Sequence, residues 1–230
     1  MKIMTFNILH CMNYKTKKIS FGDFADEILN IGADFVGLNE VRGKGFIKDY
    51  TAQAKKLGLL TNMNHYFGKA INIMGVAPYG NAFLSKYPIL SAETVKIPDP
   101  SPKTGSEMYE SRAIIKTVID AREKYTILVT HMGLNTDERE NAVKTLLSVA
   151  PDKKCIIMGD FNCTPESSEL KPLFEKYICS DTETLTFPSD NPRIKIDYIF
   201  TSPDIEIIGK GTTENIVSDH FGQWIEIKEK

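Results

Sequence analysis

Polar side chains that can bind a metal ion or carry a proton lie at the ends of short apolar runs in this sequence of 230 residues. Hard divalent cations prefer several oxygen ligands, and hydrolysis of a phosphate ester needs a base, hydrogen-bond donors and a cation in one place. Carboxylates and amides supply the oxygens, and imidazoles exchange protons near neutral pH. The residues of this kind are Asn7, Glu40, His131, Asp160, Asn162, Asp219 and His220.

Taken singly, each of these residues has an ordinary structural explanation. Asn7 can close a turn, Glu40 can be a solvated strand end, and Asp160 with Asn162 can form a side-chain turn before Pro165. It is their combination that indicates a Mg²⁺ or Mn²⁺ site held partly by water. A zinc cage is less favoured, because the sequence has four histidines and no closely paired cysteines.

The first half of the chain must deliver Asn7 and Glu40 to strand ends, and its apolar pattern alternates strands with helices. Asp23 is the expected N-cap of the first helix and Gly32 its end, while Gly58 is expected to stop the second helix. The predicted elements are strands at 2–9, 35–38, 66–73, 81–84 and 93–97 and helices at about 23–31 and 46–57.

A proline-rich loop at 98–109 separates this half from the second, and unstructured loops of about a dozen residues are often functional. In the second half, Asn135 or Thr136 can cap a helix, and Pro172 favours a break or a late start in another. The predicted elements are strands at 113–119, 125–131, 155–158, 194–201, 205–208 and 222–227 and helices at 137–149 and 168–177.

Strands outnumber helices, and the two halves have similar contents. Because each amphipathic helix needs a sheet face to cover, this pattern favours an α/β (α+β) fold with two mixed sheets packed face to face and helices outside. The length suits one large core, so a single domain over residues 1–230 is expected.

Composition narrows the class of protein. Hydrophobic residues at 42% and charged residues at 25% are typical of a globular domain and exclude a disordered, collagenous or membrane-spanning chain. The N-terminus lacks the apolar region of a secretory signal, so a cytoplasmic location is expected unless a signal was removed. The protein is expected to be a monomer. The net charge of −2 argues weakly against a strong nucleic-acid binder, although a local basic groove is compatible with it. The four cysteines, too sparse for a disulfide scaffold, are expected to be reduced.

A series of short motifs runs along nearly the whole chain. Gly-Asp-Phe-Asn at 159–162 and Ser-Asp-His at 218–220 are the most specific of them. The full series covers 4–8, 37–41, 80–89, 110–112, 130–131, 158–162, 196–200 and 218–220. In this order the motifs resemble the endonuclease/exonuclease/phosphatase family, Mg²⁺-dependent phosphoesterases that include DNase I, apurinic endonucleases, neutral sphingomyelinases and inositol polyphosphate 5-phosphatases. The sequence departs from the family at Asn39, where Gln is usual, and after His220, where Phe-Gly replaces the common Leu-Pro.

The resemblance implies a DNase I-like, four-layer αββα sandwich and a metal site. Glu40 would be the principal Mg²⁺ ligand, with Asn7 and Asp219 in or near its coordination shell. Asp160 and Asn162 would hold a second metal ion, or else act on the water and the phosphate. Mn²⁺ is a possible substitute for Mg²⁺.

The resemblance also implies catalytic roles. His220, oriented by Asp197, would lie against the scissile phosphate, and the base is either Asp160 or His220. Asn162 would donate a hydrogen bond to a phosphate oxygen. His131, supported by Glu110, would donate to a phosphate oxygen or assist the leaving group.

Three functions remain open from the sequence. The first is a phosphodiesterase acting on a nucleic acid or a phospholipid headgroup, without integral membrane association. The second is a phosphomonoesterase on a sugar or inositol phosphate, and the third is an inactive binding module on the same fold. The second would need additional basic residues, for which the candidates are Lys44, Lys69, Lys103, Arg112, Arg139, Arg193 and Lys195.

Overall fold

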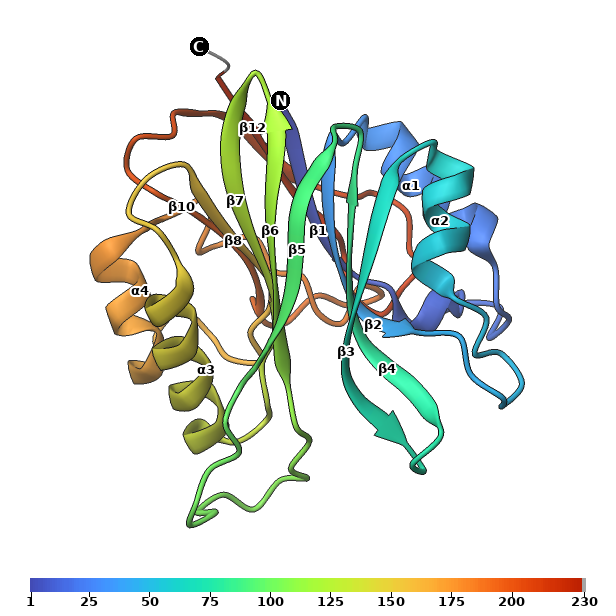
Figure 1. The fold of residues 1–230 in the computed structure, drawn as a ribbon, viewed down its shortest axis with the longest axis horizontal. Helices are drawn as coiled ribbons and strands as arrows, with labels where there is room; N and C mark the ends of the chain where they lie inside the picture. Colours follow the sequence, from blue (N-terminus) through green and yellow to red (C-terminus); the bar gives the residue numbers. More distant parts are fainter. Residues whose placement is uncertain (229–230) are drawn as a thin grey trace.

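Two six-stranded sheets form the centre of the protein, and a computed structural model describes residues 1–228 of it (Figure 1). The first sheet contains, in spatial order, β11 (Ile207–Thr212), β12 (Gln223–Ile227), β1 (Lys2–Asn7), β2 (Phe35–Arg42), β4 (Ala77–Ser85) and β3 (Asn64–Ile73). The second contains β5 (Ile89–Lys96), β6 (Ala113–Ala121), β7 (Glu123–His131), β8 (Cys155–Asp160), β10 (Asp197–Thr201) and β9 (Ile178–Cys179).

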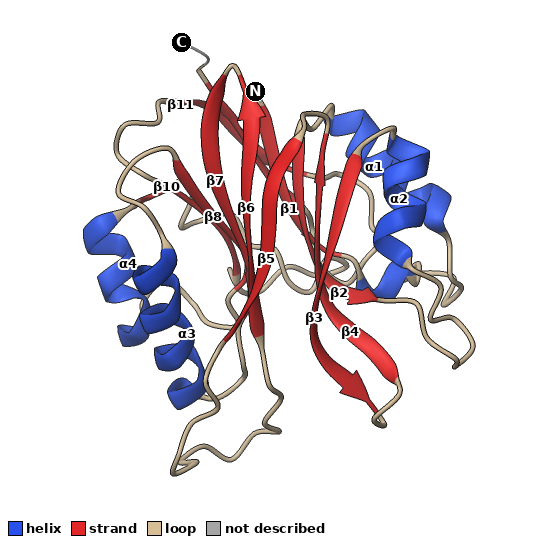
Figure 2. Cartoon of the chain, viewed as in Figure 1, coloured by secondary structure: helices blue, strands red, loops and turns tan. Residues whose placement is uncertain are grey.

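Helices cover the outer face of each sheet, so the layers follow the order αββα (Figure 2). The first sheet carries α1 (Phe21–Ile31) and α2 (Gln53–Thr61), and the second carries α3 (Thr136–Val149) and α4 (Lys171–Lys176). Short 3-10 turns occupy Leu9–Cys11 and Ser168–Leu170. This architecture confirms the fold class that the sequence predicts.

The core has three parts because strand side chains alternate between the two faces of a sheet. In β1, Ile3 packs between the sheets, whereas Met4 and Phe6 pack under α1 and α2. Met158 and Ile225 bring the facing sheets together in the same way. Fully burying one such side chain contributes about 1.5–3 kcal/mol, so the alternation fixes which residues of each strand face the other sheet.

Strand directions bring the polar strand ends to one edge of the sandwich. β1 and β2 run parallel with Asn7 beside Asn39, and β7 and β8 run parallel with His131 beside Asp160. β10 is antiparallel to β8 and starts with Asp197 opposite Asp160. β1 starts beside the chain terminus marked N in Figure 1, so the polar edge lies at the opposite end of the molecule.

The N-cap of the first helix lies three residues before the predicted one. Ser20 is the N-cap, and its hydroxyl accepts the N–H of Asp23 at 3.5 Å, which places Asp23 in the first turn. Gly32, with φ 72°, ends the helix as predicted, because its left-handed conformation lets its N–H reach the carbonyls of Ile28 and Leu29.

The second helix starts seven residues later and ends four residues later than the predicted 46–57. Phe46, which suggested helical periodicity, is fully exposed in a loop that precedes Gln53. Gly58 does not stop the helix; a Cβ at this position would lie 2.9 Å from the carbonyl oxygen of Met63, so glycine lets the chain fold back there. Asn62, with φ 54°, ends α2 instead.

Several further boundaries also differ from the predictions. β2 and β8 extend past 38 and 158, so that Glu40 and Asp160 lie within strands. β10 starts at Asp197, three residues after the predicted start, because Ile194 forms a bridge with Phe187 instead. The helix predicted at 168–177 has the late start that Pro172 favours, with a 3-10 turn before α4.

The proline-rich loop is irregular as predicted, but it is attached to the start of α3. Asp137 accepts hydrogen bonds from the N–H of Thr104 and the hydroxyl of Tyr109, both at 2.8 Å. Asn135 is the N-cap of α3, and its N–H donates to Glu138 at 3.2 Å. The loop therefore has a defined place beside the polar edge.

The four cysteines are free thiols, as predicted. Within residues 1–228, no helix combines the length and the apolar content that crossing a bilayer requires.

Candidate active site

Asn7 lies at the centre of the polar edge and joins groups from both sheets. Its Nδ2 is 3.3 Å from Glu40 Oε1, 3.1 Å from Asp160 Oδ2 and 3.5 Å from His220 Nε2. The carboxylates of Glu40 and Asp160 therefore converge. Asn7 Oδ1 accepts the N–H of Leu9 at 3.2 Å, and the amide nitrogen donates to the two acids.

Glu40 lies at a bulge in β2, where the register shifts between Leu38 and Val41. Its φ of 59° is uncommon for a residue other than glycine, and such strained positions cluster at functional sites. The bulge directs the carboxylate to the rim, with the side chain 22% exposed. Burial and the nearby charge of Asp219 raise the pKa of Glu40, while the hydrogen bond from Asn7 opposes the shift.

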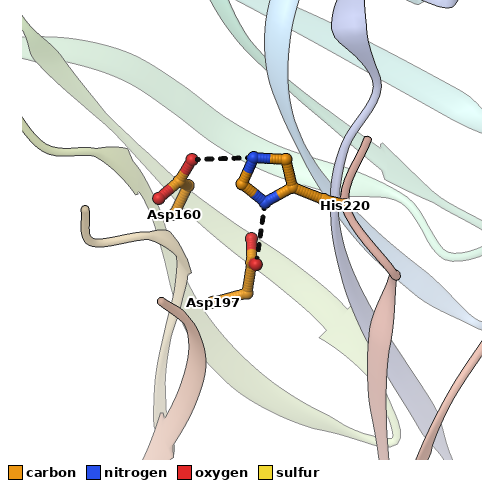
Figure 3. A group of neighbouring side chains, drawn as sticks. All are labelled: Asp160, Asp197 and His220. Atoms are coloured by element: carbon orange, nitrogen blue, oxygen red, sulfur yellow. Dashed lines mark hydrogen bonds and ion pairs between the residues drawn. The ribbon is translucent and has the colours of Figure 1, made fainter. Parts of the chain in front are cut away.

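His220 lies between two carboxylates, as Figure 3 shows. Its Nδ1 is 2.9 Å from Asp197 Oδ2, and its Nε2 is 3.7 Å from Asp160 Oδ2. Burial opposes the charged form of the ring, but Asp197 and then Asp160 outweigh it and raise the pKa of His220 to about 10. The imidazolium thus donates through Nδ1 to Asp197 and directs its Nε2–H toward Asp160.

Asp160 is the carboxylate that all parts of the site share. Its Oδ1 accepts the N–H of Asn162 at 2.9 Å, and its own N–H donates to Asn39 Oδ1 at 3.0 Å. Burial raises the pKa of Asp160 above its ordinary value; Asp197 adds to the shift, and the charge of His220 opposes it.

His131 was expected to contact Glu110, but its partner in the structure is Arg112. His131 Nδ1 is 3.2 Å from Arg112 Nη1, and Nε2 is 3.5 Å from Asp160 Oδ2. Glu110 instead forms an ion pair with Arg112 at 2.9 Å, so the guanidinium stands between the two predicted partners. Burial and the charge of Arg112 hold the pKa of His131 well below its usual value, which keeps this imidazole neutral.

Asn162 and Asp219 both line the cavity at the site. Asn162 donates through Nδ2 to the carbonyl of Met132 at 2.9 Å, and its N–H bond to Asp160 is the side-chain turn that its sequence context also suggested. Asp219 accepts from the hydroxyl of Ser218 at 3.1 Å and remains half-buried at the rim. Both residues are where the motifs predict them.

The structure also adds residues that the motif analysis did not place in the site. Arg112 was only a candidate for binding extra phosphates, and Asn39 was only a departure from the family pattern. His10 belongs to a left-handed turn (φ 48°), and its Nδ1 lies 3.4 Å from Glu40 Oε2. Burial and Arg42 lower the pKa of His10 to about 4, so this contact is not an ion pair at neutral pH. No sequence signal identified His10, because a lone histidine after a strand is common.

A cavity of about 490 Å³ opens at these residues, within the range typical of small-molecule sites. Its polar side comprises Glu40, Arg112, His131, Asp160, Asn162, Asp219 and His220. Its apolar side comprises Leu134, Phe187, Ile194 and Ile196, and the Phe187 ring lies 4.7 Å from the ring of His220. The arrangement can hold a phosphate group against imidazole, amide and carboxylate groups beside an apolar wall.

Two groups of residues in this site could hold a cation. Asp160, Asp197 and His220 offer ligand atoms within 4.8 Å of one another, but the imidazolium already offsets the two carboxylates there. Glu40 and Asp219 repel each other, and within residues 1–228 no lysine or arginine forms an ion pair with either. The second pair fits a divalent cation better, because the cation would relieve a repulsion that protein groups leave in place.

The family model for the endonuclease/exonuclease/phosphatase family matches residues 4–220. The chain therefore belongs to this family, whose members are generally phosphoesterases and nucleases that depend on divalent metals. No match was found among the curated proteins.

Solved structures share the fold at low sequence identity. An endonuclease/exonuclease/phosphatase from Beutenbergia cavernae has a TM-score of 0.80 at 18% identity, over 99% of this chain and 71% of that one. A family protein from Leptotrichia buccalis has a TM-score of 0.77 at 19% identity, with all of both chains covered. ANGEL2, a 2′,3′-cyclic phosphatase, has a TM-score of 0.71 at 15% identity, over 98% of this chain and 94% of that one.

Proposed function

We propose that this protein is a Mg²⁺-dependent phosphodiesterase that hydrolyses its substrate by in-line attack of water on phosphorus. The observation that carries the proposal is the meeting of Glu40, His131, Asp160 and His220 from both sheets in one cavity. Buried Asn7 joins the Glu40 and Asp160 carboxylates by hydrogen bonds. Family membership supports the reaction class.

The protein groups divide the reaction between them. Asp160 accepts a proton from the attacking water or orients it, because its carboxylate lines the cavity among amide and imidazole donors. His220, held by Asp197, donates to a phosphate oxygen, and Asn162 donates to another. Preorganised donors of this kind act on the charge that develops in the transition state, and losing one costs about 3 kcal/mol.

His131 and Arg112 lie on the other side of Asp160. Neutral His131 donates to a phosphate oxygen or to the leaving group, and Arg112 supplies a fixed positive charge at the cavity. Glu110 acts on the phosphate only through Arg112, which it orients.

Glu40 and Asp219 would hold the Mg²⁺ ion, with Mn²⁺ as a substitute. When bound, the ion would neutralise charge on the phosphate oxygens. The donor set fits this role, since hard oxygen ligands and room for water suit Mg²⁺ better than zinc. The hydrogen bond from Asn7 Nδ2 keeps the Glu40 carboxylate in place.

The surroundings of the cavity favour a diester over a polyphosphorylated monoester. Of the basic residues suggested for extra phosphates, Arg112 alone lines this cavity; Arg139 is paired with Glu169, and Lys195 is buried. The apolar wall instead suits a substrate with an apolar or aromatic group beside the phosphate, as in a nucleic acid or a phospholipid headgroup region. An inactive binding module is disfavoured, because such a protein has no physical need for a buried cluster of repelling acids.

A metal-dependent activity panel tests the proposal. The panel contains bis-p-nitrophenyl phosphate, p-nitrophenyl phosphate, 2′,3′-cyclic AMP, abasic and plasmid DNA, and sphingomyelin, each with Mg²⁺, Mn²⁺ or EDTA. Diester hydrolysis that EDTA abolishes is expected. Release from the monoester alone would favour the phosphomonoesterase, and no activity together with no metal binding would favour the inactive module.

Two variants link any activity to this site. Glu40→Ala and His220→Ala are each expected to lower kcat at least about a hundredfold with the fold intact. Lys96→Ala, an exposed change on β5, serves as the control. Near-normal turnover of a verified substrate in either site variant would contradict the assignment.

A further inference from the structure

A second cavity, of about 270 Å³, lies on the outer face of the first sheet, between the end of β2, the start of α2 and β3. Basic side chains from two of these elements and from the loop between them reach it, namely Arg42, Lys44 and Lys55. Its inner wall is apolar and includes Ala54 and Phe67, and the exposed imidazole of His65 stands at its border. The residues proposed for catalysis are not among those that line it.

The chain around this cavity is held in a defined conformation. Lys44 and Thr51 form an antiparallel bridge, and the N–H of Gly45 donates to the carbonyl of Tyr50 at 3.0 Å. A Cβ at Gly43 would lie 2.6 Å from Phe67 Cε1, so the glycine lets the aromatic ring lie directly against the backbone. The aromatic wall and the basic rim are therefore both built into the local fold.

The basic groups of the rim have no acidic partners. Within residues 1–228, no carboxylate lies within ion-pair distance of Arg42, Lys44 or Lys55, and no acidic residue lines the cavity. Arg42 Nε is buried without a hydrogen-bond partner, although the guanidinium lies 5.1 Å from the ring centre of Tyr50. The whole chain has a net charge of −2, so this local cluster of three basic side chains does not reflect a basic protein. The positive charge of the cluster is complementary to an anion.

The start of α2 adds donors at the same place. Ala52, with φ 53°, occupies the N-cap position and cannot supply a side-chain acceptor for the first helical N–H groups. These N–H groups lie beside the cavity, since Ala52 and Ala54 line it. An anion at this position would be bound by several groups from separate elements.

We propose that this cavity binds a nucleotide, with the phosphate at the basic rim and the base against Phe67. The combination of an apolar interior and a cationic mouth matches an aromatic ring that carries a phosphate. The volume is slightly below the range of about 300–1,000 Å³ typical of small-molecule sites, so the base and part of the sugar enter while the phosphate stays at the mouth. Base stacking on an aromatic side chain contributes about 1–3 kcal/mol in single-strand binding proteins.

The nucleotide cavity is joined to the candidate active site by buried hydrogen bonds. Gln53 accepts the N–H of Arg42 at 2.8 Å and donates to the carbonyl of His10 at 2.6 Å. His10 in turn lies against Glu40. Nucleotide binding does not require hydrolysis, so it is tested separately from the proposed enzyme activity.

Isothermal titration of the metal-free protein in EDTA with AMP, adenosine and inorganic phosphate tests the proposal. AMP is expected to bind at least tenfold more tightly than adenosine or phosphate, because neither contains both parts of the ligand. A 5′-phosphorylated dinucleotide distinguishes a free nucleotide from the end of a strand as the ligand. Binding as tight as that of AMP, or tighter, indicates the terminal nucleotide of a strand. Weaker binding than that of AMP indicates a free nucleotide. Amide chemical-shift changes on AMP addition are expected at Lys44, Ala54 and His65.

Three variants locate the binding. The double variant Lys44→Ala with Lys55→Ala is expected to weaken AMP binding at least tenfold, and Phe67→Leu is expected to weaken AMP but not phosphate. The control, Lys96→Ala with Lys124→Ala, removes two exposed charges from the other sheet and is expected to change the Kd less than twofold. AMP binding that is absent at millimolar concentration, unchanged in the double variant, or matched by phosphate alone would overturn the proposal.

Discussion

Asn39 connects the two sheets at the point where the catalytic groups meet. Its Nδ2 donates to the carbonyl of Thr130 at 2.8 Å and to Asn81 Oδ1 at 2.9 Å, and its Oδ1 accepts the N–H of Asp160. The side chain is fully buried, so each of these partners depends on it. A residue from β2 thereby fixes the backbone that carries the shared carboxylate of β8.

Asn39→Ala is expected to lower the free energy of unfolding by about 1–3 kcal/mol or more, because buried partners lose their hydrogen bonds. Urea denaturation measures this change, and kcat is expected to fall as well, since Asp160 is no longer held. Asn64→Ala is the matched control; its amide donates to two carbonyls at an exposed position and should cost much less. Equal losses in the two variants would contradict the role of Asn39.

Asp197→Asn tests the orientation of His220. The amide keeps the size of the side chain but removes the charge that orients and stabilises the imidazolium. An analogous change in a serine protease triad lowers kcat about 10⁴-fold. We expect kcat for the verified substrate to fall at least about a hundredfold while KM changes little. Asp152→Asn, an exposed change beside Lys176, should leave kcat unchanged. A larger effect on KM than on kcat would indicate a binding role instead.

At the scale of the elements, α1 carries a buried acid whose charge opposes folding. Glu27 is 4% exposed and accepts from Asn215 Nδ2 at 2.6 Å. Burial raises the pKa of Glu27 above its ordinary value of 4.5, while the hydrogen bonds from Asn215 oppose the shift. Below this ordinary value both the folded and the unfolded protein are protonated, so the cost appears only as the pH rises.

Glu27→Gln is therefore expected to raise the Tm at neutral pH and to have little effect below about pH 4. The glutamine oxygen still accepts from Asn215, so the hydrogen bond is retained. Thermal unfolding at both pH values measures the difference, with Asp26→Asn, an exposed neighbour on the same helix, as the control. A stabilisation that persists unchanged at low pH would show that the buried charge is not the cause.

The elements also show which features could be predicted from the sequence. α3, β6 and β7 lie close to the predicted ranges 137–149, 113–119 and 125–131, because each buries its apolar residues on a regular pattern. The position of α2 could not be predicted this way: Phe46 and Ile47 mimic a helical stripe but stay exposed, and what ends the helix is the left-handed Asn62. Local periodicity does not determine which apolar residues pack against a sheet.

The same limit applies to the candidate site. The sequence predicted that polar residues at strand ends would meet at one edge, and Asp160, Asn162, Asp219 and His220 line one cavity. The motifs did not predict that Arg112 separates Glu110 from His131, since that depends on side-chain reach across two strands. The bulge that turns Glu40 toward the rim was also not predictable, because no glycine or proline marks it.

At the scale of the whole molecule, the last two strands join the first sheet and close the site. β12 pairs with β1, so His220 arrives beside Asn7 from the far end of the chain. Ser218 fixes this return by donating to the carbonyl of Asn7 at 2.7 Å. The first sheet therefore contains strands from both ends of the chain.

The distance between the two sheets is set by close contacts at Gly37. A Cβ there would lie 2.7 Å from Met158 Sδ and 3.0 Å from Val129 Cγ2. Gly37→Ala is expected to destabilise the protein by about 1–3 kcal/mol, as overpacking does. Gly22→Ala is the control; it meets nothing within 4 Å in α1 and is expected to stabilise by up to about 1 kcal/mol. Urea denaturation compares the two, and a neutral Gly37→Ala would mean that the sheets can separate there without cost.

Metal binding is expected to stabilise the native fold, because the two acids proposed to hold the ion are far apart in the sequence. Glu40 belongs to β2 and Asp219 to the segment just before β12, and unfolding separates them. An ion that binds only the native state adds about 2.7 kcal/mol at a hundred times its Kd. The Tm should therefore rise with Mg²⁺ or Mn²⁺ and return with EDTA. Glu40→Gln should lose most of this rise even without substrate, whereas Asp26→Asn should keep it. A Tm that saturating Mg²⁺ and Mn²⁺ leave unchanged would remove the cation from the proposed reaction.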